Sequence, residues 1–145
     1  MRYLMNEGYL DLPGNWHDRT VHALLPAIPE VTGSNLVLTR DDLPYGSEFA
    51  DYVDVQKSRF RRELTDLQMQ YDAPCRVDER PGHSLAFTWR RDGLPVHHLA
   101  LIILDAPTVL TLTYTSPGQL PPQVRRDIVA ALSGFRFHRR ENTPA

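Results

Sequence analysis

The chain has 145 residues, of which 41% are hydrophobic and 23% charged, a composition typical of one folded globular domain and unlike that of disordered, collagenous or membrane chains. The formal net charge of -2 provides no positive field for a run of phosphates, so we expect no nucleic-acid partner. The single cysteine, Cys75, excludes an intramolecular disulfide. We expect one domain over residues 1–137 and a flexible tail over the polar residues 138–145.

No targeting or membrane-spanning segment is predicted. Glu7 and Asp11 interrupt the N-terminal stretch, where a secretory signal needs a continuous apolar run. The longest apolar run, residues 99–104, is far shorter than the roughly 20 residues that span a bilayer. We therefore expect a cytoplasmic protein that does not insert into a membrane by itself.

Short β-prone runs fill the first 40 residues. Residues 3–5 and 9–12 flank the turn-forming triplet 6–8, which predicts a β-hairpin. Residues 20–25 and 35–40 are two more such runs, separated by prolines and a glycine, which predicts two antiparallel strands joined by a loop. Together they predict the first four strands of a sheet.

The next segment, residues 47–71, predicts one long helix with Ser47 as its N-cap. It contains no glycine or proline, and its apolar residues recur at helical spacing: Phe49, Val53, Phe60, Leu64, Leu67 and Tyr71. Gln56 interrupts this apolar stripe, and a buried amide without a hydrogen-bond partner costs on the order of 1–3 kcal/mol. Gln56 either bonds a neighbouring strand, lies at the edge of the stripe, or has a function.

The C-terminal half predicts a three-stranded meander over residues 85–90, 96–104 and 108–115, followed by a helix. Turn residues separate the strands, and the last strand places leucines and a tyrosine on one face and threonines on the other. Pro122 and Gly134 bracket the helix. The predicted fold class is α+β, a mainly antiparallel twisted β-sheet with one long and one C-terminal α-helix packed on it.

The strand at 96–104 is apolar on both faces from Leu99 onward. A sheet with one solvated face should alternate polar and apolar residues, so both faces of this strand must be covered. Either helices of the chain lie on each face, or a concave apolar face receives a helix of a partner.

No pattern predicts catalysis, a metal or a cofactor. His97 and His98 are adjacent on a predicted strand and point to opposite faces, so they cannot bind one ion together. Cys75 and Ser84 lack the local signature of a nucleophile, and the glycines are scattered singly, which excludes a phosphate-binding loop. We expect a protein that is not an enzyme and has no cofactor.

The chain resembles the Eag family of effector-associated chaperones, whose domains are DcrB-like and related in fold to the photosystem protein PsbP. The resemblance rests on Asn6-Glu7-Gly8, Leu12-Pro13, Trp16, Asp18-Arg19-Thr20-Val21, Leu36-Val37-Leu38-Thr39-Arg40-Asp41, and a long helix that bears Tyr52 and Gln56. It implies a dimeric bacterial chaperone that binds the N-terminal transmembrane helices of PAAR-containing type VI secretion effectors. Such a chaperone shields these helices from water and aids loading of the effector on the VgrG spike.

The resemblance also implies a site. In that family aliphatic side chains of the sheet and glutamine side chains contact the client helix, and Gln56 matches the glutamine of the long helix. The aliphatic residues that we assign to the same groove are Leu24, Leu38, Leu101 and Ile103. An alternative function is a DcrB-like or PsbP-like accessory module with a different protein partner.

Overall fold

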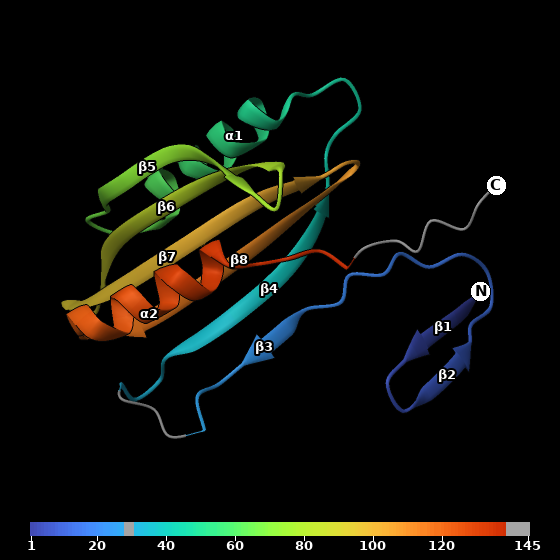
Figure 1. Cartoon of the computed structure of the whole chain (residues 1–145), viewed down its shortest axis with the longest axis horizontal. Helices are drawn as coiled ribbons and strands as arrows, with labels where there is room; N and C mark the ends of the chain where they lie inside the picture. The colour runs from blue at the N-terminus through green and yellow to red at the C-terminus, as the bar shows by residue number, and fades with distance from the viewer. Residues whose placement is uncertain (28–30, 139–145) are drawn as a thin grey trace.

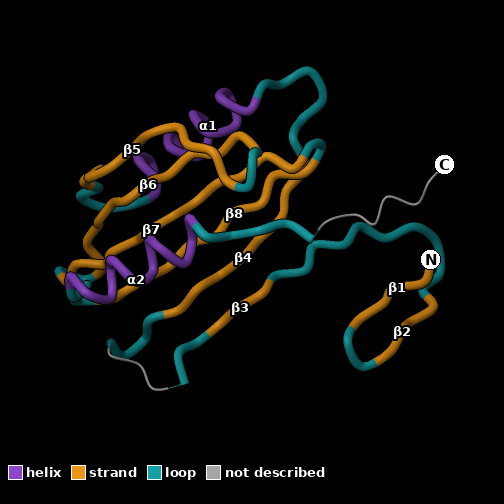
Figure 2. The backbone as a smooth tube through the Cα atoms, in the orientation of Figure 1, coloured by secondary structure: helices purple, strands orange, loops and turns teal. Residues whose placement is uncertain are grey.

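The computed structural model describes residues 1–27 and 31–138, and its main feature is a six-stranded antiparallel sheet with a helix on each face (Figures 1 and 2). The strand order is β3-β4-β8-β7-β6-β5. The strands are β3 (His22–Leu24), β4 (Asn35–Asp42), β5 (Gln68–Val77), β6 (Arg80–Arg91), β7 (Leu94–Asp105) and β8 (Thr108–Pro117). The predicted α+β class is confirmed.

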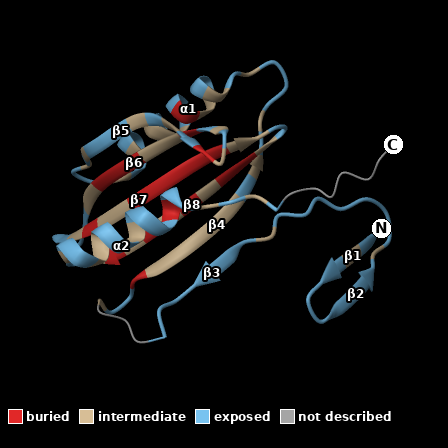
Figure 3. Cartoon of the chain, viewed as in Figure 1, coloured by how far each residue is buried: buried red, intermediate tan, exposed pale blue. Residues whose placement is uncertain are grey.

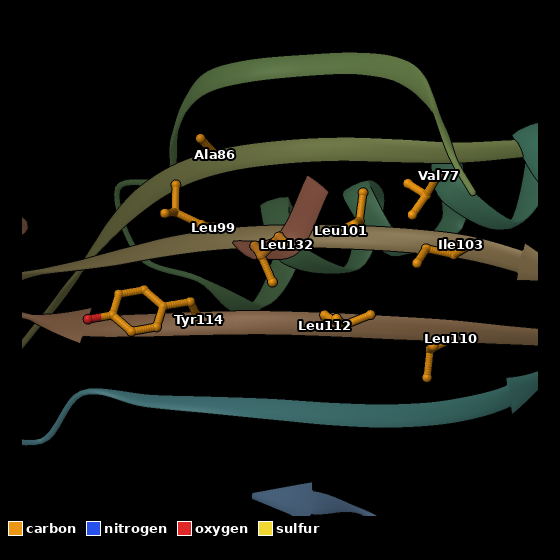
Figure 4. Packing of buried hydrophobic residues seen from close by; sticks show 9 residues of the cluster. All are labelled: Val77, Ala86, Leu99, Leu101, Ile103, Leu110, Leu112, Tyr114 and Leu132. Carbon is orange, nitrogen blue, oxygen red and sulfur yellow. The ribbon is translucent and has the colours of Figure 1, made fainter. Parts of the chain in front are cut away.

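Strand β7 is the central element, and it is buried on both faces. Leu99, Leu101 and Ile103 point to one face, where they form a cluster with β8, β6 and helix α2 (Pro122–Ser133), as Figure 4 shows. Ala100 and Ile102 point to the other face, where they pack with helix α1 (Phe49–Glu63). Helices of the chain itself therefore cover both faces of this apolar strand.

The C-terminal segment follows α2 back across the sheet. Leu132 of α2 is buried in the cluster, and Phe135 and Phe137 pack against it with their rings edge to face, 4.9 Å apart. The Phe137 amide donates to Asp78 Oδ2 (2.8 Å), and the Arg80 guanidinium lies 3.6 Å from the centre of the Phe137 ring. These contacts hold the end of the domain on the β5–β6 turn. Residues 139–145 of the predicted tail lie outside the described residues.

The predicted hairpin forms, but it does not join the main sheet. Strands β1 (Arg2–Met5) and β2 (Gly8–Asp11) make a separate two-stranded sheet that projects from the body (Figure 1). The prediction of four sheet strands in the first 40 residues is therefore wrong, because only β3 and β4 belong to the large sheet.

The predicted long helix ends eight residues early, and a strand was missed. Helix α1 stops at Glu63, Asp66 adopts a positive φ of 54°, and β5 begins at Gln68. Leu64, Leu67 and Met69 still pack on the α1 cluster, but they reach it from the turn and from β5. Pairing of β5 with the long strand β6 outweighs the helical spacing, so the meander has four strands instead of three.

Alanine substitutions in the buried core and on the exposed edge strand should differ in their effect on the free energy of unfolding. Ile103 is 0% exposed, so Ile103→Ala should lower the free energy of unfolding by about 2–5 kcal/mol through the cavity it leaves. Leu24 is 56% exposed on the edge strand, so Leu24→Ala should cost less than about 1 kcal/mol. Urea denaturation measures both, and equal losses would contradict this placement.

Candidate functional site

A groove runs along the α1 side of the sheet, where the helix leaves β8 and β4 uncovered. Its volume is about 540 Å³. One wall is α1, and the floor consists of side chains from β4, β8, β7 and β6. The lining residues are Arg19, Thr39, Arg40, Asp41, Tyr52, Gln56, Arg59, Phe60, Glu63, Leu64, Phe87, Trp89, His98, Ala100, Ile102, Thr111 and Thr113.

Threonines form the open part of the floor. In β8 the residues alternate, so that Leu110, Leu112 and Tyr114 face the α2 cluster while the threonines between them face the groove. Thr39 of β4 pairs with Thr111 of β8 and extends this polar strip across the neighbouring strand. Each hydroxyl can donate and accept one or more hydrogen bonds, so the floor offers a bound chain both polar and methyl contacts.

Gln56 lies on the helical wall of the groove. It stands four residues from both Tyr52 and Phe60, so these three side chains share one face of α1. Gln56 is half-buried, and no buried side-chain nitrogen or oxygen in the described residues lacks a hydrogen-bond partner. The amide therefore lies at the edge of the apolar stripe, where solvent or a bound molecule can reach it.

A tyrosine ties this helix to the uncovered strand. Tyr52 Oη donates to Asp41 Oδ2 of β4 at 3.1 Å. Burial, and then the neighbouring Asp41 charge, raise the pKa of Tyr52 to about 12, so the phenol keeps its proton at neutral pH. Arg19 and Arg59 lie at the same end of the groove lining, which gives its rim charges of both signs.

Opposite Tyr52, Lys57 holds the other side of the helix. Its ammonium lies 2.9 Å from Asp72 Oδ2 of β5, and the His83 ring of β6 bonds the second oxygen of the same carboxylate. Burial alone would raise the pKa of Asp72, but the bonds from His83 and Lys57 outweigh it and leave the pKa below its ordinary value. Helix α1 is therefore anchored on both sides, and the groove is a fixed feature of the fold.

A hydrogen-bonded aromatic row closes the far part of the floor. Trp89 Nε1 donates to His98 Nε2 (2.8 Å), and His98 Nδ1 lies 3.0 Å from Thr115 Oγ1. Because Nε2 accepts from the indole, the proton of the neutral ring is on Nδ1, which donates to the threonine. Burial, with Arg91 and His97 nearby, lowers the pKa of His98 to about 4.

The five residues assigned from the resemblance do not lie on one surface. Gln56 lines the α1 groove. Leu101 and Ile103 are 4% and 0% exposed beneath the α2 side, and Leu38 packs on the same cluster. Leu24 pairs with Leu36 of β4, on the α2 side, and is exposed. The sheet separates Gln56 from these four aliphatic residues, because the alternation of side chains along each strand puts them on the face opposite α1.

The groove residues that the sequence reasoning missed are the threonines and the aromatic row. The alternation of Thr111, Thr113 and Thr115 was visible, but the sequence does not tell which face of β8 a helix leaves open. Trp89 and His98 come together only through the pairing of β6 with β7. In the described ranges, no three His, Cys, Asp or Glu side chains converge as metal ligands would.

The fold is an α+β domain with an antiparallel sheet and one helix on each face. The family model for DcrB matches residues 7–134, and the chain belongs to the DcrB family. No curated protein matches the chain. None of the helices in the described part of the chain has the length and apolarity needed to cross a bilayer.

Three solved structures are similar to this one. A protein of unknown function from Pseudomonas aeruginosa, PA94, has a TM-score of 0.79 and 22% identity, with 97% of this chain and 98% of that chain covered. LpqN of Mycobacterium tuberculosis, involved in cell envelope biogenesis, has a TM-score of 0.52 and 13% identity over 75% of this chain and 63% of that chain. Cyanobacterial PsbP from Synechocystis sp. PCC 6803 has a TM-score of 0.48 and 13% identity, over 86% and 93%.

His98 should make the fold sensitive to acid. The folded-state pKa lies near 4 and the ordinary value is 6.5, so between these pH values the unfolded chain binds more protons and stability falls as the pH falls. From pH 7 to 4.5 this loss should be on the order of 2 kcal/mol, allowing for the partial exposure of the ring. His98→Gln should remove that part of the pH dependence in urea titrations. His22→Gln, on the exposed edge strand, should retain it, and identical profiles for wild type and His98→Gln would contradict the assignment.

Proposed function

We propose that the chain is a cytoplasmic chaperone of a type VI secretion system. It shields the N-terminal transmembrane helices of a PAAR-containing effector from water and aids loading of that effector on the VgrG spike. The observation that carries the proposal is the fixed groove between α1 and the uncovered strands β8 and β4, with Gln56 on its wall. In this proposal the client helix lies in the α1 groove. The binding site is thus on the α1 side of the sheet, and not on the α2 side, where the four aliphatic residues assigned from the resemblance lie.

The dimensions of the groove support this occupant. Along β7 the floor runs from His98 to Ile102, four steps of roughly 3.3 Å, which gives a length of about 13 Å. About nine residues of a helix have the same length at 1.5 Å per residue. A volume of about 540 Å³ admits the side chains along one face of such a helical segment rather than the whole helix. One protomer therefore covers one side of part of its client.

The chemistry of the lining also supports it. Transmembrane helices pack through small residues, and the polar groups on their surfaces bond to hydroxyl and amide side chains of neighbouring helices. The threonine floor and the Gln56 amide offer the same groups, while Phe60 and Trp89 offer apolar contact. Without a chaperone, exposure of an apolar helix costs roughly 25 cal/mol per Å² and leads to aggregation.

Removing the Gln56 amide should weaken client binding without affecting the fold. We expect Gln56→Ala to reduce affinity about fivefold, since a hydrogen bond to a membrane helix contributes on the order of 1 kcal/mol. The measurement is co-expression with the N-terminal helical fragment of a PAAR effector, followed by co-purification from the soluble fraction. The matched control is Gln70→Ala, on the exposed β5 edge strand away from the groove.

A bulky charged side chain on the groove floor should reduce client recovery more than the loss of the Gln56 amide. Thr113→Arg places a long charged side chain where the client helix would lie, and we expect it to abolish recovery of the soluble fragment. Urea denaturation verifies that the variant is folded. A fragment that stays insoluble with the wild-type chain would contradict the chaperone function and favour an accessory module with another protein partner. Undiminished recovery with Thr113→Arg would contradict the groove.

A further inference from the structure

Two arginines line the α1 groove without an ion-pair partner in the described residues. Arg59 belongs to helix α1, and Arg19 belongs to the linker before β3. Figure 3 shows this linker exposed, near the mostly half-buried β4. The cations of the ion pairs in the described part of the chain are Arg2, Lys57, Arg80 and His83. Neither groove arginine is among them, so both charges are available to a bound molecule.

The two guanidiniums come from opposite sides of the groove. Arg59 stands three residues after Gln56 on the helical wall, and residues at this spacing are neighbours on a helix. Arg19 lies on the other side, where it also lines the small cavity beside Asp41 at the end of β4. Both charges act on the Tyr52 phenol, where they oppose the larger effects of burial and Asp41 on its pKa. A negative group bound beside Tyr52 would therefore be attracted by both arginines.

The carboxylates of the groove do not fully offset this positive charge. Asp41 accepts from the Tyr52 phenol through Oδ2 (3.1 Å) and from the following main-chain amide through Oδ1 (2.9 Å), so both of its oxygens are engaged. The other carboxylate, Glu63, is the last residue of α1 and forms no ion pair within the described ranges. Arg40 adds a third guanidinium, so the lining carries three such groups against two carboxylates.

The hydrogen-bonding groups that this part of the groove offers are mainly donors. A guanidinium only donates, and a carboxylate only accepts and can take two parallel N–H bonds from one arginine. The amide of Gln56, next to Arg59 on the helix, can add a further donor. An uncharged helix would need only the threonine floor and this amide. The arginines therefore fit a client that brings a carboxylate of its own.

We propose that Arg19 and Arg59 bind an acidic side chain of the client, so that the groove selects apolar helices that carry a glutamate or aspartate. This inference rests on the proposed function and specifies its client. A carboxylate in an apolar helix is costly to cover unless it is paired with a cation. Acidic residues are rare in transmembrane segments, so recognition of one distinguishes the client from other apolar helices.

The test compares two synthetic helical peptides of about 18 residues, the length of a short transmembrane helix. Both consist of leucine, alanine and serine, carry a polyethylene glycol chain for solubility, and differ at one central position, glutamate in one and glutamine in the other. We expect the wild-type chain to bind the glutamate peptide about tenfold more tightly at neutral pH and low salt, because charge-assisted hydrogen bonds are roughly twice as strong as neutral ones. The combined variant Arg19→Gln and Arg59→Gln should bind both peptides equally. Fluorescence anisotropy of labelled peptides measures the affinities.

The matched control is the combined variant Arg61→Gln and Arg62→Gln. It removes the same charge from two exposed arginines of α1 that do not line the groove, so it should keep the preference for glutamate. Equal binding of both peptides by the wild type, a preference that persists without Arg19 and Arg59, or its loss in the control overturns this inference and leaves the groove in place. Binding of neither peptide by the wild type would instead contradict the client groove of the proposed function.

Discussion

Burial of strand β7 on both faces is the constraint on which the rest of the structure depends. Leu99, Leu101 and Ile103 on one side, and Ala100 and Ile102 on the other, require cover on both sides of the sheet. The chain has one long helix before β7 and one after it, so each face receives one helix. Six strands at about 4.8 Å spacing span roughly 24 Å, whereas a helix is about 10 Å wide. Each face therefore keeps an uncovered strip, and on the α1 side that strip is the groove.

The uncovered strips differ in composition, and this difference distinguishes the two faces. On the α1 side, β8 and β4 present threonines, which have high β-propensity but tolerate water. On the α2 side, Leu36 and Leu38 are partly buried against the cluster that α2 and the C-terminal phenylalanines complete. The sheet edges are also protected from further pairing. Strand β3 has only three residues, and β5 contains Pro74 and a register shift between Met69 and Tyr71.

Helices and strands were predicted correctly where the local sequence pattern matched the burial of the element in the folded chain. The alternation in β8 and the Pro122 and Gly134 brackets of α2 placed these elements correctly. Strand β5 was missed because Leu64, Leu67 and Tyr71 fit helical spacing, and Gln68–Val77 contains a proline and no clear alternation. The site was predicted in part. Spacing put Gln56 on one face of α1 with Tyr52 and Phe60, but which sheet face lies opposite depends on strand register and on which helix covers it. Neither is a local property.

The linker before β3 connects the groove to the hairpin. Arg19 lines the groove near Tyr52, and the preceding residues Trp16 to Asp18 lie beside Arg40 and Asp41 at the end of β4. The chain then leaves the sheet at Trp16 to form the hairpin. The linker therefore joins the Arg19 side of the groove rim to the hairpin within a few residues of chain.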